Sequence, residues 1–225
     1  MKGGITVNFS VAIDGPAGAG KSTIAKLVAK EFNLMYINTG AMYRAVALKA
    51  KENNLAPSNI EEICSLIETM KMEFKEDDLL LNGENIQNKI TLPEISSIVS
   101  EYAKIQEVRK MLVKLQREMS KKFNVIMDGR DIGTVVLKDA PFKFFLTATA
   151  EERANRRFLE LKNRDIPCSY DKILNDIIER DYKDSHREVD PLKKAEDAIE
   201  IDTTGLNIEE VTEKINSYIR NGIKN

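Results

Sequence analysis

The sequence of 225 residues is poor in cysteine and histidine, with two of the former and one of the latter. Cys64 and Cys168 lie far apart in the chain and form neither a metal-binding nor a redox spacing. This distribution argues against a cysteine-based metal or redox site. We expect both residues to be reduced thiols in the packing of a cytoplasmic protein.

Long apolar runs are absent as well. No run approaches the ~18 residues that a membrane-spanning helix needs. The first ten residues, MKGGITVNFS, contain neither the apolar core nor the small-residue cleavage site of a secretion signal. We therefore expect a cytoplasmic protein without a membrane partner.

An excess of one charge sign is also missing. The 34 basic and 36 acidic side chains give a net charge of −2, whereas a general nucleic-acid binder usually carries a basic excess. We therefore expect no nucleic-acid partner. Hydrophobic residues make up 42% and charged residues 31% of the chain, which is typical of a globular protein. The length suits one α/β domain with inserted subdomains.

Apolar runs and amphipathic segments alternate along the chain. Short apolar runs predict strands at residues 9–14, 34–37, 125–128, 142–148 and 198–202. Helical spacing predicts helices at 21–32, 41–53, 56–70, 93–122 with a break near Lys104, 151–163, 170–184 and 207–221. The alternation of strand and helix predicts βαβ units, and hence a five-stranded parallel sheet flanked by helices.

The middle of the chain interrupts this alternation. Residues 71–90 alternate between polar and apolar side chains and contain Asn82-Gly83, a strong hairpin signal. We interpret them as a small antiparallel sheet. The segment 54–115 is therefore predicted to be an insertion in a parallel-sheet core.

The stretch GPAGAGKST matches the phosphate-binding pattern G-x-x-x-x-G-K-[ST] and lies between a predicted strand and a predicted helix, as that pattern requires. Its glycines allow the backbone to curl, so that N–H groups point at phosphate oxygens. Lys21 is expected to reach the β- and γ-phosphates of ATP, with Ser22 offering a hydroxyl to Mg²⁺ and Thr23 a second hydroxyl. The residues of this loop expected to bind ATP are Gly15, Pro16, Ala17, Gly18, Ala19, Gly20, Lys21, Ser22 and Thr23.

A loop of this kind is usually paired with an acid at the end of a neighbouring strand, which binds Mg²⁺ directly or through water. Asp128 closes the apolar run VIM and is our first choice, with Ser22, for the metal. The alternative is Asp14, at the end of the first strand. If Asp14 is not the metal ligand, we expect it to cap the loop's own amides.

Other classes of P-loop protein fit less well. Guanine-specific switches use an N/T-K-x-D pattern, and NKIT at 88–91 lacks the acid and falls in the predicted antiparallel ribbon. No signature helix of a transporter ATPase is present, and motors and helicases are usually longer and more basic. A small-molecule kinase remains, and it needs a second site for the phosphoryl acceptor.

Arginine clusters suit an acceptor that is itself a phosphate, because arginine holds phosphate oxygens in a bidentate manner. The alternative is a solvated helix face on which Glu151, Glu152 and Glu160 pair with arginines. Exposed ATP would also be hydrolysed, so we expect a closing lid and assign it to 151–165. The clusters are TGAMYR at 39–44, EERANRR at 151–157 and ERDYKDSHRE at 179–188.

Five motifs together resemble the bacterial cytidylate kinases (CMP/dCMP kinases) of the nucleoside monophosphate (NMP) kinase superfamily. The P-loop alone is not specific, but five motifs in one order over about residues 9–220 are. The insertion is similar to the enlarged NMP-binding domain of that family. The resemblance implies a monomeric, Mg²⁺-dependent enzyme that transfers the γ-phosphoryl group of ATP to CMP or dCMP. The motifs are IDGPAGAGKST, TGAMYRA, MDGRDIGTVV, EERANRR and ERDYKDSHRE.

The resemblance also implies roles for the matching residues. The CMP phosphate would be surrounded by Thr39, Tyr43, Arg44 and Arg130. Cytosine would be read by Ser100, Arg109, Asp131 and Arg187, and the ribose would be held by Arg180 and Asp184. The ATP phosphates would be covered by Arg153, Arg156 and Arg157. Charge neutralisation then falls to Lys21, Arg130, Arg153, Arg157 and Arg180. No general base is required, since the acceptor phosphate is already a nucleophile.

Asp131 suits the reading of cytosine, which presents an amino donor where uracil presents an acceptor oxygen. A carboxylate accepts from that amine and repels the oxygen, and such a site discriminates because the wrong base leaves buried polar groups unpaired. This carboxylate argues against a kinase of the same architecture that acts on UMP. The missing N/T-K-x-D pattern and the ordered arginines argue against a P-loop switch.

Some positions leave alternatives open. Ser22 stands where many nucleotide kinases have glycine, so the hydroxyl that serves Mg²⁺ is undecided, and Thr39 stands where many have serine. Ser100 and Arg109 lie in an amphipathic helix, where an exposed helix surface is the alternative. His186 is expected to face solvent or to pack, because this chemistry needs no base.

The predicted organisation has three parts. A P-loop core takes residues 1–38, 116–150 and 166–225. An NMP-binding insertion takes residues 39–115, and a lid takes residues 151–165.

Overall fold

The computed structural model describes residues 9–223 and contains two sheets. A five-stranded parallel sheet has the order β2-β6-β1-β7-β8, and a three-stranded antiparallel sheet has the order β3-β4-β5. The strands of the parallel sheet are β1 (Ser10–Asp14), β2 (Met35–Asn38), β6 (Val125–Gly129), β7 (Phe142–Thr147) and β8 (Ile199–Asp202). Those of the antiparallel sheet are β3 (Met72–Lys75), β4 (Asp78–Leu81) and β5 (Glu84–Asn85).

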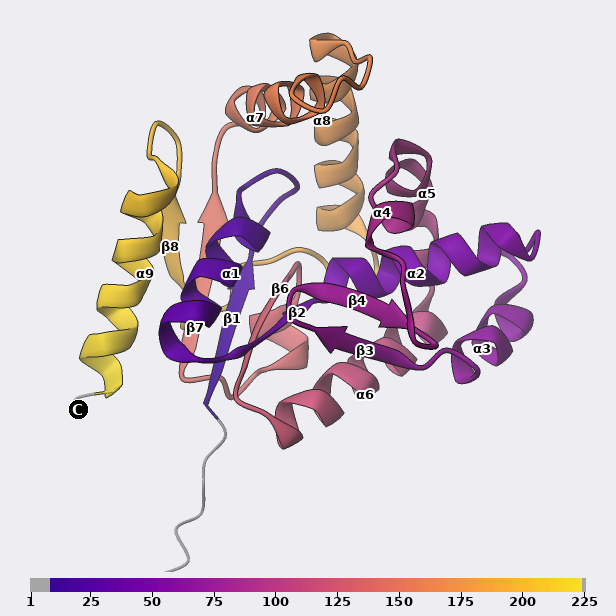
Figure 1. The fold of residues 1–225 in the computed structure, drawn as a ribbon, viewed down its shortest axis with the longest axis horizontal. Coiled ribbons are helices and arrows are strands. Elements are labelled where there is room, and N and C mark those ends of the chain that lie inside the picture. The colour runs from indigo at the N-terminus through magenta and orange to yellow at the C-terminus, as the bar shows by residue number, and fades with distance from the viewer. Residues whose placement is uncertain (1–8, 224–225) are drawn as a thin grey trace, which may run out of the picture.

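Helices cover the parallel sheet and build the insertion (Figure 1). They are α1 (Lys21–Phe32), α2 (Thr39–Glu52), α3 (Ile60–Glu68), α4 (Gln87–Ile90), α5 (Pro93–Ala103), α6 (Gln106–Lys122), α7 (Ala150–Lys162), α8 (Tyr170–His186) and α9 (Ile208–Ile223). A single π-helical turn, η1 (Ile132–Val136), follows β6 after Arg130 and Asp131.

The strands of the parallel sheet bury both faces, because successive side chains point to opposite sides. In β1, Val11 and Ile13 pack with residues of α1 and α9, whereas Ala12 packs on the other face with α2 and α6. All three side chains are at most 1% exposed. The apolar run of β1 therefore reflects a two-sided core.

The carboxyl ends of the strands meet at one edge of the sheet. Asp14 of β1 lies opposite Gly129 of β6, and Asn38 of β2 lies opposite Asp128. Figure 1 shows the loop between β1 and α1 at this edge, with α7 and α8 beyond it. The sheet thus brings together segments that lie far apart in the sequence.

The insertion follows the prediction in part. Asn82 and Gly83, both with positive φ, form the two-residue turn between β4 and β5. The expected break near Lys104 separates α5 from α6. We expected the segment 88–91 to lie in the antiparallel ribbon, and this expectation is wrong. Residues up to Ile90 belong to the short helix α4.

The fold class is confirmed: a parallel five-stranded sheet flanked by helices carries a small antiparallel sheet. Within residues 9–223, no helix is both long and apolar enough to cross a membrane. The helix expected at 56–70 is shorter, since α3 begins only at Ile60 and the Asn59 side chain accepts a hydrogen bond from the Ala56 amide before it.

Candidate active site

The loop between β1 and α1 has the backbone geometry of a phosphate cradle. Gly15, Gly18 and Gly20 all have positive φ, a conformation that L side chains rarely adopt. A Cβ on Gly15 would lie 2.0 Å from the carbonyl oxygen of Leu146 in β7. Only glycine allows this close approach. Glycine is therefore needed in the loop for two reasons: the positive φ of the backbone and the contact of Gly15 with β7.

Lys21 begins α1 and is buried beneath the loop. Its Nζ donates a 2.7 Å hydrogen bond to the carbonyl oxygen of Pro16. Burial and the nearby Arg130 guanidinium lower the pKa of Lys21, while Asp128 opposes this. A phosphate brought into the cradle would stabilise the charged form, so the side chain is poised for an anion.

Asp128, at the end of β6, holds two hydroxyl groups. The Ser22 hydroxyl donates to Oδ2 at 2.8 Å and the Tyr36 hydroxyl donates to Oδ1 at 2.8 Å. Ser22 and Asp128 therefore place two oxygen donors together beside the cradle, and oxygen is the ligand that Mg²⁺ prefers. The pair fits Mg²⁺, which is usually held by one or two carboxylates together with substrate phosphates.

Asp14 serves a different segment. Its carboxylate accepts hydrogen bonds from the amides of Ile132 at 2.8 Å and Gly133 at 2.7 Å. The expectation that Asp14 caps the amides of the P-loop is therefore wrong, because the carboxylate caps η1 instead. Burial raises the pKa of Asp14 to about 7, although these two amides oppose the shift.

A pocket next to this edge collects the predicted acceptor residues. Its wall comes from α2, α5, α6, the segment after β6 and α8. The lining residues are Thr39, Gly40, Tyr43, Val99, Ser100, Ala103, Arg109, Gly129, Arg130, Asp131, Arg180, Asp184 and Arg187. All of the predicted acceptor-site residues except Arg44 line it. Ser100 therefore borders a cavity.

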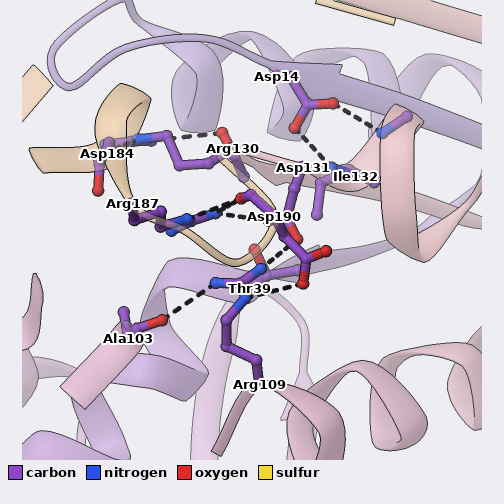
Figure 2. Close-up of polar contacts among 12 residues, drawn as sticks. Asp14, Thr39, Ala103, Arg109, Arg130, Asp131, Ile132, Asp184, Arg187 and Asp190 are labelled. Atoms are coloured by element: carbon purple, nitrogen blue, oxygen red, sulfur yellow. Dashed lines mark hydrogen bonds and ion pairs between the residues drawn. The ribbon is translucent and has the colours of Figure 1, made fainter. Parts of the chain in front are cut away.

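Asp131 forms the polar centre of the pocket (Figure 2). Its carboxylate pairs with the Arg109 guanidinium and lies 3.6 Å from Nη2 of Arg187. Burial raises the pKa of Asp131, and the two arginines oppose that shift. Asp131 is 4% exposed, so a ligand group that reaches its carboxylate would be largely removed from water.

Arg109 is buried in the wall. It is 1% exposed and its other donors reach Oδ2 of Asp190 at 3.0 Å and the carbonyl oxygen of Ala103 at 3.2 Å. The guanidinium also lies 5.5 Å from the centre of the Tyr43 ring. The alternative of an exposed helix surface is thus wrong for Arg109.

A second ion-pair group lines the same pocket, and its arginines are close enough to Lys21 of the P-loop to interact with it electrostatically. Arg130 donates a 2.8 Å hydrogen bond to Oδ2 of Asp184, and Nε of Arg180 lies 3.9 Å from the same oxygen. Burial would raise the pKa of Asp184, but Arg130 and Arg180 outweigh it and hold the pKa below its usual value. Removal from water and the adjacent Arg130 lower the pKa of Arg180 to about 10.

Unpaired donors accompany these arginines. Nε of Arg44 and Nε of Arg180 are buried without a hydrogen-bond partner. The Thr39 hydroxyl, by contrast, donates to the carbonyl oxygen of Asp128 at 2.7 Å. Buried donors normally find acceptors, so these two guanidinium groups suit an anionic ligand such as a phosphate.

The three arginines of α7 make unequal contacts. Arg156 pairs with Glu152 and donates to the carbonyl oxygen of Thr203 at 2.7 Å. Arg157 pairs with Glu160, as expected for a salt-bridged helix face. Arg153 is buried and contacts the P-loop main chain. The structure therefore brings only Arg153 of the three into contact with the P-loop itself.

His186 lies outside the pocket. Its ring is exposed and stacks on Tyr182 with 4.1 Å between ring centres. The solvent-facing position matches the expectation.

Sequence reasoning missed Tyr36, Asp181 and Asp190. Their side chains form hydrogen bonds with Asp128, with the P-loop residue Ala17 and with Arg109, respectively. Only Asp181, inside the motif ERDYKDSHRE, had a signal in the sequence.

Comparison with known proteins agrees with the fold. A family model described as cytidylate kinase matches residues 11–221. A cytidylate kinase of Clostridium perfringens is 64% identical over 211 residues, which cover 94% of this chain and 97% of that protein. A cytidylate kinase of Clostridium acetobutylicum is 59% identical over 213 residues, which cover 95% and 98%.

A solved structure of an uncharacterized protein from Eubacterium ventriosum superposes with a TM-score of 0.54 at 14% identity, covering 95% of this chain and 99% of that chain. This likeness supports the fold alone. The family match spans nearly the whole chain and includes both the P-loop and the residues that line the pocket. The chain therefore belongs to the cytidylate kinase family and is an enzyme, a kinase.

Proposed function

We propose that this kinase transfers the γ-phosphoryl group of ATP to CMP or dCMP and releases CDP or dCDP with ADP. The observation that carries the proposal is the buried Asp131 carboxylate in a pocket that adjoins the P-loop. Asp128 and Asp131 lie three residues apart on the segment that follows the centre of β6. In this proposal one short segment contacts both substrates, since Asp128 binds the Mg²⁺ of ATP and Asp131 binds the cytosine of CMP.

The donor side of the proposal uses the P-loop. Main-chain amides of residues 15–20 and the N-terminus of α1 would bind the ATP phosphates. Lys21 would neutralise the β- and γ-phosphates. Mg²⁺ would be held by Ser22 and Asp128 with phosphate oxygens, and would supply positive charge to the transferring group.

The acceptor side uses the pocket. Arg44 and Arg130 would bind the phosphate of CMP, and the buried Nε of Arg44 has no hydrogen-bond partner. Arg180 and Asp184 would hold the ribose. Asp131 would accept a hydrogen bond from the cytosine amine, while Arg109 and Arg187 oppose the rise in its pKa that burial causes. Tyr43 lines the same wall.

Phosphoryl transfer between two phosphates needs positioning and charge neutralisation more than covalent chemistry. Lys21, Arg130 and Arg180 surround the junction of the two sites, and they interact electrostatically with one another. No general base is proposed, because the acceptor phosphate is already a nucleophile. A lid at 151–165, with Arg156 and Arg157 on the ATP phosphates, would exclude water on closure.

We keep the division into core, insertion and lid, a monomeric state and a cytoplasmic location as parts of the proposal. The chain is similar over nearly its whole length to enzymes of one named activity. Its near-neutral charge suits small-molecule substrates rather than nucleic acid.

The test is ADP release from Mg·ATP in a coupled assay with CMP, dCMP, UMP, AMP, GMP and no acceptor in parallel. We expect rapid turnover with CMP and dCMP and little with the others. Turnover without an acceptor, or none with any monophosphate, would refute the proposed reaction and favour an NTPase or a switch.

A further inference from the structure

Ala17, in the middle of the P-loop, is held by two side chains that come from outside the loop. Its carbonyl oxygen accepts a 2.9 Å hydrogen bond from Nη1 of Arg153 in α7. Its amide donates a 3.2 Å hydrogen bond to Oδ1 of Asp181 in α8. The two side chains also form an ion pair with each other through Nη1 of Arg153 and Oδ2 of Asp181. The result is a closed ring of contacts around one loop residue.

The geometry fixes Arg153 in this position. Its Nε donates a 2.9 Å hydrogen bond to the carbonyl oxygen of Ala148, just before α7. The side chain is 6% exposed and that of Asp181 is 22% exposed. A Cβ on Gly18 would lie 3.1 Å from Cβ of Arg153, so the loop also packs directly against the stem of this residue.

We propose that Arg153 and Asp181 are positioning residues that hold Ala17 and so keep the P-loop in the conformation that binds ATP. The inference rests on the proposed function, since it assigns the loop to ATP. It differs from a direct contact of Arg153 with the ATP phosphates, because Nε and Nη1 are directed at protein groups. The loop is thereby tied to α7 and α8 rather than to the sheet alone.

The physical basis is the cost of ordering a glycine-rich loop. Gly15, Gly18 and Gly20 give the chain great conformational freedom when it is not bound. Charge-assisted hydrogen bonds to the main chain restrict that freedom before ATP arrives. A loop ordered in advance loses less entropy on binding, so the pair raises nucleotide affinity without touching the nucleotide.

The arrangement also places two roles on adjacent residues of α8. Arg180 lines the acceptor pocket, whereas Asp181 reaches Ala17 of the P-loop. Neighbouring residues on a helix point in directions about 100° apart. One helix therefore contacts the donor loop and the acceptor pocket at the same level along its axis.

The first measurement is hydrogen exchange of individual amides by NMR in nucleotide-free protein. In Asp181→Asn, we expect the Ala17 amide to exchange at least about tenfold faster, because a neutral amide oxygen is a weaker acceptor than a carboxylate. Affinity for Mg·ADP, measured by calorimetry, should fall about tenfold. These two readouts need no acceptor, so they remain informative if the enzyme does not phosphorylate CMP.

Kinetics on the same variants separate positioning from general loss of stability. KM for ATP should rise about tenfold in Asp181→Asn, while KM for CMP stays within about twofold. Arg153→Met should also raise KM for ATP and leave KM for CMP nearly unchanged. Arg153→Lys should keep part of the ATP affinity, because the lysine amine can still donate a hydrogen bond to a main-chain oxygen. Asp176→Asn, which removes one exposed carboxylate from the same helix, should leave all readouts unchanged.

Two outcomes would overturn the proposal. Unchanged exchange of the Ala17 amide in Asp181→Asn would show that the carboxylate does not hold the loop. Faster exchange with unchanged affinity for Mg·ADP would show that holding the loop has no consequence for the nucleotide. If any variant unfolds at the assay temperature, exchange and affinity are measured at a lower temperature at which its circular dichroism matches that of the wild type.

Discussion

The Ser22 hydroxyl donates a 2.8 Å hydrogen bond to Oδ2 of Asp128, across 106 residues of sequence. Ser22 stands in the first turn of α1 and Asp128 near the end of β6. Because α1 follows β1, and β1 pairs with β6 in parallel, the two groups meet at the same edge of the sheet. The pairing makes this serine and this aspartate the candidate Mg²⁺ site.

Asp128→Asn should remove the charged oxygen donor of that site. We expect the rate at saturating ATP and CMP to fall by at least about a hundredfold, comparable to the loss of one preorganised electrostatic group in other active sites. The Mg²⁺ concentration that gives half-maximal activity should also rise. A steady-state titration with Mg²⁺ checks both. Tyr36→Phe, which removes only the hydrogen bond to Oδ1, should cost much less. Equal Mg²⁺ dependence in Asp128→Asn and wild type would assign the metal to other groups.

Asp131→Asn should weaken the choice between cytosine and uracil. An amide can donate to the uracil oxygen that a carboxylate repels, so the ratio of kcat/KM for CMP to that for UMP should fall by about a hundredfold. Parallel assays with the two acceptors measure the ratio directly. A ratio that stays at the wild-type value would mean that another group reads the base.

Arg109→Met should destabilise the whole fold. It leaves the buried Asp131 with Arg187 at 3.6 Å as its nearest basic partner. Removing one partner of a buried ion pair costs about 3–5 kcal/mol in the free energy of unfolding. Urea unfolding measures this loss. Lys110→Met, at the next and exposed position of α6, is the matched control and should change the free energy by less than about 0.5 kcal/mol. Equal effects of the two substitutions would contradict the role of Arg109 in the wall.

Asp14 should make stability depend on pH. Its pKa is raised from 3.8 to about 7 in the folded protein, so the folded state retains this proton over a range in which the unfolded state has lost it. The stabilisation from the protonated group is complete below about pH 4 and is lost as the pH rises to 7.

The corresponding measurement compares wild type with Asp14→Asn in urea at pH 5 and pH 8. From the ~1.4 kcal/mol that each pKa unit represents, the wild type should lose about 2–3 kcal/mol more than the variant between these two values. The comparison with the variant cancels the contributions of other titrating groups. Parallel pH profiles for the two proteins would show that Asp14 titrates near its ordinary pKa.

Much of the fold was predictable because its signals are local. The apolar run before GPAGAGKST predicts β1, and the Asn82-Gly83 pair predicts the turn between β4 and β5. The turn η1 was not predicted, since IGTVV has no helical period of its own. Its first amides are held by Asp14, which lies 118 residues away from Ile132.

The candidate site was predictable to a similar extent. The P-loop carries glycines at a spacing that has a chemical meaning. The acceptor residues were expected from the family resemblance, and all of them but Arg44 line one pocket. Tyr36 and Asp190 carry no such signal. A tyrosine in a strand and an acid in a loop are ordinary until the fold places them against Asp128 and Arg109.

The sequence by itself determined the elements and the chemistry that they carry, because helix and strand periods, glycine spacing and residue type are local properties. The tertiary structure decided the pairing of charges. It placed Asp14 on η1, and it directed both Arg153 and Asp181 to Ala17. Ion pairs depend on distances of a few ångströms between elements that the sequence separates by many residues. Only the packing of the sheet and its helices sets those distances.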